Sequence, residues 1–215
     1  MSVTAEERVR HPVAARLTER LMRSGEQRGQ AAHRRRLLEG LSGRVVEVGA
    51  GSGINFRWYP ASVTEVVAVE PEAYLRGLAE RAAAAARVPV GAIDGVSGAL
   101  PLEDASCDAG VACLVLCTVP DQGRALAELA RVIRPGGELR FYEHVVSHRS
   151  LEAGFQRFAD ATLWPRIAGG CHLARDTAEA IERAGFRIER YDRFPFSPSA
   201  TLPAAPHVLG VARRP

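Results

Sequence analysis

The chain has 215 residues, of which 47% are hydrophobic and 25% are charged, a composition typical of one globular domain and not of a disordered or fibrous protein. The formal net charge of +3 comes from arginine interleaved with acidic residues, which disfavours a nucleic-acid partner. No apolar run approaches the ~18 residues of a membrane span and no signal peptide is visible, so we expect a cytoplasmic protein without a membrane span.

Residues 1–42 are predicted to form an N-terminal helical cap on a single domain that spans residues 43–215. Apolar residues recur at a spacing of four from Val13 to Leu21, and a second leucine-rich stretch follows two glycines. The arginines at positions 34–36 lie beside His33 and form the one basic cluster of the chain. We expect this cluster to be a solvated helix face, with contact to an acidic ligand or to nucleic acid as the alternative.

From residue 44 onward, short apolar runs alternate with segments of helical spacing. Strands are expected at residues 44–49, 65–70, 88–93, 107–116, 138–145, 187–194 and 207–214. Helices are expected at residues 71–87, 121–133 and 177–186, with a turn at 134–137. Such alternation predicts an α/β fold with a mostly parallel sheet, helices on both faces, and ligands beyond the carboxyl ends of the strands.

Residues 151–172 interrupt this rhythm and are predicted to form an irregular lid or a helical insertion. The segment is rich in aromatic residues and glycine, which makes it the natural place for substrate specificity. Phe155, Phe158, Trp164 and Cys171 are the candidate substrate-binding residues, because an apolar pocket that excludes water favours reactions in which charge is lost.

A glycine-rich turn lies at the first predicted strand-to-helix junction, in the sequence EVGAGSG of residues 47–53. Glycine permits a tight turn and a close approach of the backbone to a ligand. In a dinucleotide fold the third glycine lies three residues after the second, whereas Gly53 lies two residues after Gly51. This spacing disfavours NAD.

Glu70 and Pro71 end the second predicted strand beside the glycine-rich turn. A carboxylate at this position can accept hydrogen bonds from both hydroxyls of a ribose. No P-loop lysine and no metal-ligating cluster accompanies these residues, so the sequence predicts a nucleoside ligand without a phosphate chain and no metal.

The ordered motifs EVGAGSG, AVEP, LPLEDASCDAG and ELARVIRPGGELRFYEH resemble those of class I S-adenosylmethionine (SAM)-dependent methyltransferases, and the resemblance covers residues 40–215. The runs GSGINFRWYP, LVLCTV, RFYEHV and GGCHLAR are similar to the methyltransferase-like alkyl thiol S-methyltransferases, which lie near the ubiquinone and menaquinone methyltransferases. The resemblance implies a Rossmann-like fold of seven strands in the usual methyltransferase order, with the last strand antiparallel. It also implies SAM as methyl donor and S-adenosylhomocysteine as product.

The donor site that the resemblance implies surrounds the glycine-rich turn. Glu47 and the turn would hold the amino acid part of SAM, Glu70 the ribose, and Leu114 would lie near the methionine portion. The family's usual acidic residue before the LP pair is absent here, which leaves Asp94, Ser97 or a backbone amide for the adenine. The full candidate set is Glu47, Gly49, Ala50, Gly51, Gly53, Asn55, Glu70, Pro71, Asp94, Val96, Ser97 and Leu114.

The leading hypothesis for the reaction is S-methylation of a small thiol. A free thiol has a pKa of roughly 8.5, so a nearby base would raise the fraction of thiolate at neutral pH. His144 follows the fifth predicted strand and His172 lies in the predicted lid, and these two are the candidate catalytic residues. For His144 a histidine bonded to local backbone is the equal alternative.

Other functions use the same donor site. C- or O-methylation of a quinol, phenol or natural-product scaffold is the first alternative, and a non-catalytic SAM-binding module is the second. The four cysteines, which are Cys107, Cys113, Cys117 and Cys171, lack a CxxC pair and zinc spacing, and we expect buried reduced thiols. The sequence leaves the acceptor and the oligomeric state open.

Overall fold

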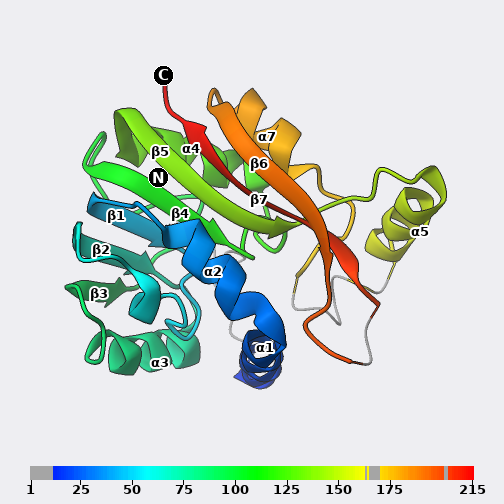
Figure 1. The fold of residues 1–215 in the computed structure, drawn as a ribbon, viewed down its shortest axis with the longest axis horizontal. Coiled ribbons are helices and arrows are strands. Elements are labelled where there is room, and N and C mark those ends of the chain that lie inside the picture. Colours follow the sequence, from blue (N-terminus) through cyan, green and yellow to red (C-terminus); the bar gives the residue numbers. More distant parts are fainter. Residues whose placement is uncertain (1–11, 163, 165–169, 201–202) are drawn as a thin grey trace.

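The computed structural model describes residues 12–162, 164, 170–200 and 203–215. Its seven-stranded sheet has the order β3-β2-β1-β4-β5-β7-β6 (Figure 1). The strands are β1 (Gly43–Val48), β2 (Val63–Val69), β3 (Val90–Ile93), β4 (Cys107–Cys113), β5 (Ile133–His144), β6 (Arg187–Phe196) and β7 (Ala205–Arg213). Strand β7 is antiparallel to β5 and β6, and the other pairs are parallel. The expected fold class and strand order are therefore confirmed.

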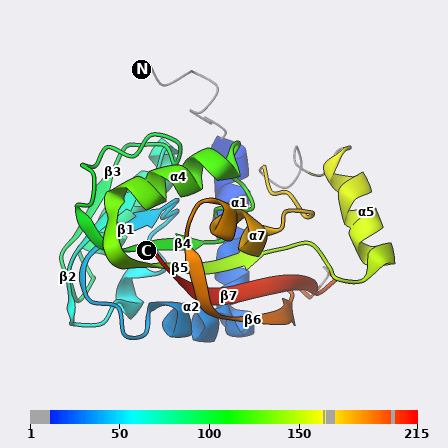
Figure 2. The same cartoon turned by 90° about the horizontal axis from the view of Figure 1, so that it is seen from above.

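Helices cover both faces of this sheet (Figure 2). On one face, α4 (Gln122–Val132) and α7 (Thr177–Arg183) pack on a core that contains Val46, Leu129 and Ile181. On the other face, α2 (Ala31–Leu38), the short helix η3 (Phe56–Trp58) and α3 (Ala73–Ala83) enclose a second core. Alternate residues of β1 point to opposite faces, as strand geometry requires, so that Val45 belongs to the second core and Val46 to the first.

The N-terminal helices form a bent rod in front of the sheet (Figure 1). Helix α1 (Pro12–Gly25) continues through η2 (Glu26–Gln30) into α2, and the bend lies at Gly29, whose φ of 104° is accessible to glycine. The helical prediction is confirmed for residues 12–38, whereas residues 1–11 lie outside the described residues. The domain boundary at residue 42 stays a prediction.

Several expected boundaries differ from the structure by a few residues, and two of them have a clear cause in the backbone. The turn expected at residues 134–137 lies inside β5, where the pairing with β4 shifts register and Gly136 has a φ of 77°. The fourth strand ends at Cys113 and not at residue 116, because Leu114 adopts a left-handed backbone with a φ of 58°. A local deviation of this kind ends the pairing with β5 and starts a loop at the carboxyl edge of the sheet.

The predicted lid begins with helix α5 (Ser150–Asp160), which projects from the side of the molecule (Figures 1 and 2). Gln156 anchors it: its side-chain oxygen accepts from Ser147 N–H at 2.6 Å, and its side-chain nitrogen donates to the Val145 carbonyl oxygen at 3.3 Å. The helical alternative of the prediction is confirmed for residues 150–160, while residues 163 and 165–169 lie outside the described residues.

Candidate functional site

The glycine-rich turn joins β1 to the rest of the domain at the carboxyl edge of the sheet. Gly49, Gly51 and Gly53 all have positive φ, at 64°, 58° and 76°. The amides of Gly49 and Ala50 both donate to the carbonyl oxygen of Val69, at 2.8 and 3.2 Å. A Cβ on Gly49 would lie 2.3 Å from Val115 Cγ2, so this glycine is required by space as well as by conformation.

Glu70 lies directly under this turn. Its Oε2 accepts a hydrogen bond from Gly51 N–H at 2.8 Å, and its Oε1 accepts one from Glu72 N–H at 3.0 Å. The side chain is buried, and burial raises its pKa despite these two hydrogen bonds. A carboxylate has about four lone-pair sites, so further hydrogen bonds can be accepted here.

The remaining residues expected near the nucleoside follow β3. Asp94 forms an ion pair with Arg76 at 3.1 Å, and the same guanidinium donates to the Glu70 carbonyl oxygen at 2.8 Å. Val96 is buried and forms an isolated bridge with Ala99, while Ser97 is half-buried. The structure therefore places these residues and Glu70 at one edge, after neighbouring strands β2 and β3.

Glu47 belongs to a buried polar network beneath the turn. Its two oxygens accept hydrogen bonds from Asn55 Nδ2 at 2.6 Å and from the Tyr59 hydroxyl at 2.7 Å. Arg34 Nη1 donates to Asn55 Oδ1 at 2.9 Å, and Arg34 Nε donates to Glu26 Oε1 at 2.8 Å. Both carboxylate oxygens of Glu47 thus accept hydrogen bonds from protein groups beneath the turn.

The solvated face expected for residues 34–36 is wrong for Arg34. This side chain is buried, with 2% of the residue exposed, whereas Arg35 and Arg36 are exposed as expected. Helix α2 turns Arg34 toward the sheet, and the buried cation is stabilised there by an ion pair with Glu26 and a hydrogen bond to Asn55. A run of charged residues in a sequence does not show which of its side chains faces the protein interior.

Replacing Glu47 by glutamine is expected to change how stability depends on pH. Burial raises the pKa of Glu47 from 4.5 to about 7. Between these values the folded state binds more protons than the unfolded state, so the free energy of unfolding falls as pH rises and levels off above about 7. Glutamine does not titrate, so Glu47→Gln should gain about 1–3 kcal/mol relative to wild type between pH 5 and 7.5.

Urea unfolding at pH 5, 6, 7 and 8 measures this difference. Glu39→Gln is the matched control, because Glu39 is exposed and should give the same difference from wild type at every pH. Glu143 is present in wild type and in both variants, so its effect on the free energy of unfolding cancels in the differences between them. A pH-independent difference between wild type and Glu47→Gln would contradict the prediction.

The loop after β4 is held by Glu143, a residue that sequence reasoning missed. Its Oε1 accepts from the amides of Val115 and Leu116 at 3.0 and 2.9 Å, and its Oε2 accepts from Cys117 N–H at 3.1 Å. Burial raises its pKa to about 7. Leu114 N–H donates to the Tyr142 carbonyl oxygen at 2.7 Å. The sequence does contain a signal for this role, since Glu143 is an acidic residue within the strand expected at residues 138–145.

His144 ends β5 within a cluster of aromatic side chains. It is buried and lies opposite His207 in the antiparallel pair of β5 and β7, and the centroids of the two rings are 5.4 Å apart. Neither ring nitrogen forms a regular hydrogen bond to the described part of the chain. Burial lowers the pKa of His207 to about 4, so this neighbour stays neutral at physiological pH.

This aromatic cluster, defined as His33, Tyr142, His144, Phe194, Phe196 and His207, joins α2 to β5, β6 and β7. His33 stacks on Phe194 with centroids 4.3 Å apart. Sequence reasoning missed most of its members, since they come from four separate segments of the chain.

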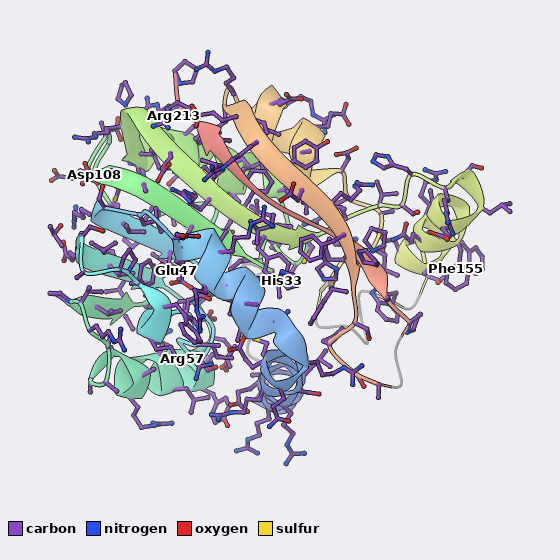
Figure 3. All side chains as sticks on the ribbon, viewed as in Figure 1. His33, Glu47, Arg57, Asp108, Phe155 and Arg213 are labelled. Atoms are coloured by element: carbon purple, nitrogen blue, oxygen red, sulfur yellow. The ribbon has the colours of Figure 1, made fainter. Side chains whose placement is uncertain are left out.

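The substrate-binding candidates of the lid separate into two groups. Phe155 and Phe158 are 70% and 69% exposed on α5, and Figure 3 shows Phe155 far from Glu47. The structure therefore does not bring these two rings into an enclosed pocket, because α5 projects away from the sheet. Trp164 is half-buried, and its Nε1 is without a hydrogen-bond partner among the described residues.

Cys171 and His172 do reach the carboxyl edge of the sheet. His172 N–H donates to the Cys117 carbonyl oxygen at 2.8 Å, and its ring lies 3.7 Å from Asp160 Oδ2. Cys171 is half-buried beside His144.

Among the described residues, no helix has both the length and the apolar character needed to traverse a bilayer.

The chain is similar in sequence to known methyltransferases. The family model described as a methyltransferase domain matches residues 46–141. The chain is 36% identical over 185 residues to thiol S-methyltransferase TMT1B of Mus musculus, covering 81% of this chain and 73% of that protein. It is 35% identical over 181 residues to thiol S-methyltransferase TMT1A of Homo sapiens, covering 80% and 72%.

A solved structure with the same fold is geranyl diphosphate C-methyltransferase from Streptomyces coelicolor A3(2), in complex with Mg2+, geranyl diphosphate and S-adenosyl-L-homocysteine. The TM-score is 0.66 at 14% identity, covering 86% of this chain and 77% of that chain.

Proposed function

Because the chain belongs to the SAM-dependent methyltransferases, in the family of the thiol S-methyltransferases, we propose that it transfers the methyl group of SAM to the sulfur of a small thiol. The donor half of this proposal rests on the contact between Glu70 and Gly51, which places a carboxylate against a turn of three positive-φ glycines. The thiol half rests on the relatives named above.

The residues at this edge fit SAM. Around Gly51 the backbone is open, since a Cβ there would meet only Met22 Sδ at 3.9 Å, so a ligand can approach the turn closely. We assign the amino acid part of SAM to residues 49–53, with Glu47 and Asn55 as positioning residues beneath them. Glu70 and Pro71 would hold the ribose, and Leu114 the methionine portion.

Adenine is assigned to the loop after β3. Asp94, Val96 and Ser97 lie there, next to Glu70, whose N–H donates to the Ile93 carbonyl oxygen at 3.1 Å. The half-buried side chain of Ser97 can donate or accept a hydrogen bond, and Val96 offers an apolar surface for a ring.

His144 is assigned as the proton acceptor for the thiol. SAM supplies a methyl group bound to a positively charged sulfur. Methyl transfer forms one carbon–sulfur bond and breaks another, and the thiol proton passes to a base. His144 is buried, and its ring nitrogens are free of regular hydrogen bonds to the described residues, so one of them can accept the proton. His172 is the second candidate.

The aromatic cluster supplies the surroundings of the acceptor. Tyr142 and His207 are buried, and His207 is neutral, so this wall of the site is apolar and excludes water. A thiolate that attacks a sulfonium loses charge as the bond forms, so a dry site favours the transition state over solvated reactants.

Formation of S-adenosylhomocysteine with matched acceptors tests the proposed function. We expect turnover with an alkyl thiol and none with the corresponding alcohol or amine. Turnover with a quinol alone would overturn the thiol acceptor and keep the donor site. Absence of turnover with every acceptor, in a protein that binds SAM, would favour a binding module.

His144→Ala is expected to lower kcat for the thiol about tenfold at pH 7, and less at pH 9. This loss is smaller than the rate factor that a general base usually contributes, because a thiol of pKa roughly 8.5 is already partly ionised at pH 7, to a few per cent. The readout is the pH profile of kcat. His148→Ala is the control, since His148 is exposed four residues away. A loss that does not depend on pH would assign His144 a purely structural role.

A further inference from the structure

The segment 170–172 runs alongside the loop that follows β4. His172 N–H donates to the Cys117 carbonyl oxygen at 2.8 Å, and a Cβ on Gly170 would lie 3.2 Å from the Thr118 carbonyl oxygen. Two segments far apart in the sequence are thus joined backbone to backbone, and each carries a cysteine at the junction.

The two thiols at this junction interact directly. Cys117 is 3% exposed, Cys171 is half-buried, and each thiol is close enough to the other to shift its pKa. Both are free thiols in the structure. A disulfide requires Cα atoms about 4.4–6.8 Å apart, and the backbone hydrogen bond from His172 to Cys117 brings the two cysteine-bearing segments into direct contact.

The surroundings of the pair give the two thiols different reactivity. The neighbouring Cys117 thiol, followed by the His144 side chain, lowers the pKa of Cys171 to about 5. The interaction with Cys171, together with burial, raises the pKa of Cys117 well above its ordinary value. Burial raises the pKa of Cys107 and raises that of Cys113 to about 12. Cys171 is therefore the attacking thiolate among the four cysteines, and Cys117 the resolving thiol.

We propose that Cys117 and Cys171 form a reversible dithiol–disulfide pair that undergoes exchange with small disulfides. The exchange chemistry rests on the junction alone, and the choice of small disulfides rests on the proposed function, since they are the oxidised counterparts of its thiol acceptors. In the first step the Cys171 thiolate attacks the disulfide, which forms a mixed disulfide and releases one thiolate. In the second step Cys117 attacks the Cys171 sulfur and loses its proton to solvent or the departing thiolate. The protein dithiol is oxidised, and one small disulfide is reduced to two thiols.

The test uses the full-length reduced protein and hydroxyethyl disulfide as the oxidant. After exchange, free thiols are blocked at acidic pH and the digest is examined by mass spectrometry. We expect a linked peptide pair that contains Cys117 and Cys171, with Cys107 and Cys113 blocked as free thiols. Dithiothreitol should remove the link.

Serine variants assign the order of the two steps. Cys117→Ser should stop at a stable mixed disulfide on Cys171, Cys171→Ser should give neither product, and Cys107→Ser should behave as wild type. Thermal unfolding of each variant verifies that it is folded. A mixed disulfide that persists on Cys171 in wild type, no reaction at Cys171, or a link to Cys107 or Cys113 would each overturn the proposal. Methyl transfer is measured separately on reduced protein, so failure of the proposed function leaves this result intact.

Discussion

Glu70→Ala is expected to raise the dissociation constant for S-adenosylhomocysteine about 100-fold. Two ribose hydroxyls donating to a charged acceptor contribute on the order of 1.5 kcal/mol each, and about 3 kcal/mol corresponds to a factor of about 100. The buried carboxylate also accepts from Gly51 N–H, so its removal loosens the turn that approaches the ligand. Isothermal titration calorimetry measures the affinity without requiring an acceptor.

A double-mutant cycle separates the ribose contact from the effect on the turn. The 2′-deoxy analogue of S-adenosylhomocysteine should bind wild type more weakly than the parent ligand does, and Glu70→Ala should bind both about equally. Glu80→Gln is the control for charge, because Glu80 is exposed on α3 and should leave the affinity unchanged. Equal losses for the analogue on wild type and on Glu70→Ala would remove Glu70 from the ribose site.

The sequence predicts the central sheet well because its signals are local. Apolar runs such as VVEV in β1 and the glycines that follow specify a strand and a turn without reference to the rest of the chain. Local signals do not predict the order of the strands, because the alternation of strands and helices predicts only a parallel sheet. That order was predicted from the family resemblance and is confirmed by the structure.

The polar residues that support the site depend on contacts between distant segments. Arg34 is buried because α2 docks on the sheet above Asn55, and no pattern within α2 distinguishes it from Arg35. Glu143 is similar, since its partners are the amides of a loop on the neighbouring strand. A single sequence shows that such residues are charged but not which partner satisfies them.

The acceptor side is the least predictable part of the site. Phe155 and Phe158 satisfy the expectation of an aromatic lid in composition, but both are exposed on α5. The less exposed rings come instead from the strands, where β6 and β7 bring half-buried Phe194 and buried His207 next to buried Tyr142. Register across an antiparallel pair decides this arrangement, and register is a tertiary property.

Gly49→Ala is expected to reduce the affinity for S-adenosylhomocysteine more than 100-fold and to lower the stability of the protein. A left-handed backbone costs a residue with a Cβ about 1–2 kcal/mol. In addition, the new Cβ would lie 2.3 Å from Val115 Cγ2, a distance that forces one of the two segments to move. Val115 cannot retreat freely, because its amide donates to Glu143 Oε1 at 3.0 Å. The turn must therefore shift away from the position that we assign to the ligand.

Three further variants divide this effect into its causes, with calorimetric affinity and thermal unfolding as readouts. Gly51→Ala adds a Cβ at a φ of 58° with open space around it, so it reports conformational strain alone. Val115→Ala in the Gly49→Ala background removes the crowding methyl group and should restore the affinity toward that of Gly51→Ala. Gly91→Ala in β3 has neither strain nor a close neighbour and should match wild type. If Gly49→Ala binds as well as Gly51→Ala, the loop held by Glu143 yields to the new methyl group, and the turn owes its position to backbone conformation alone.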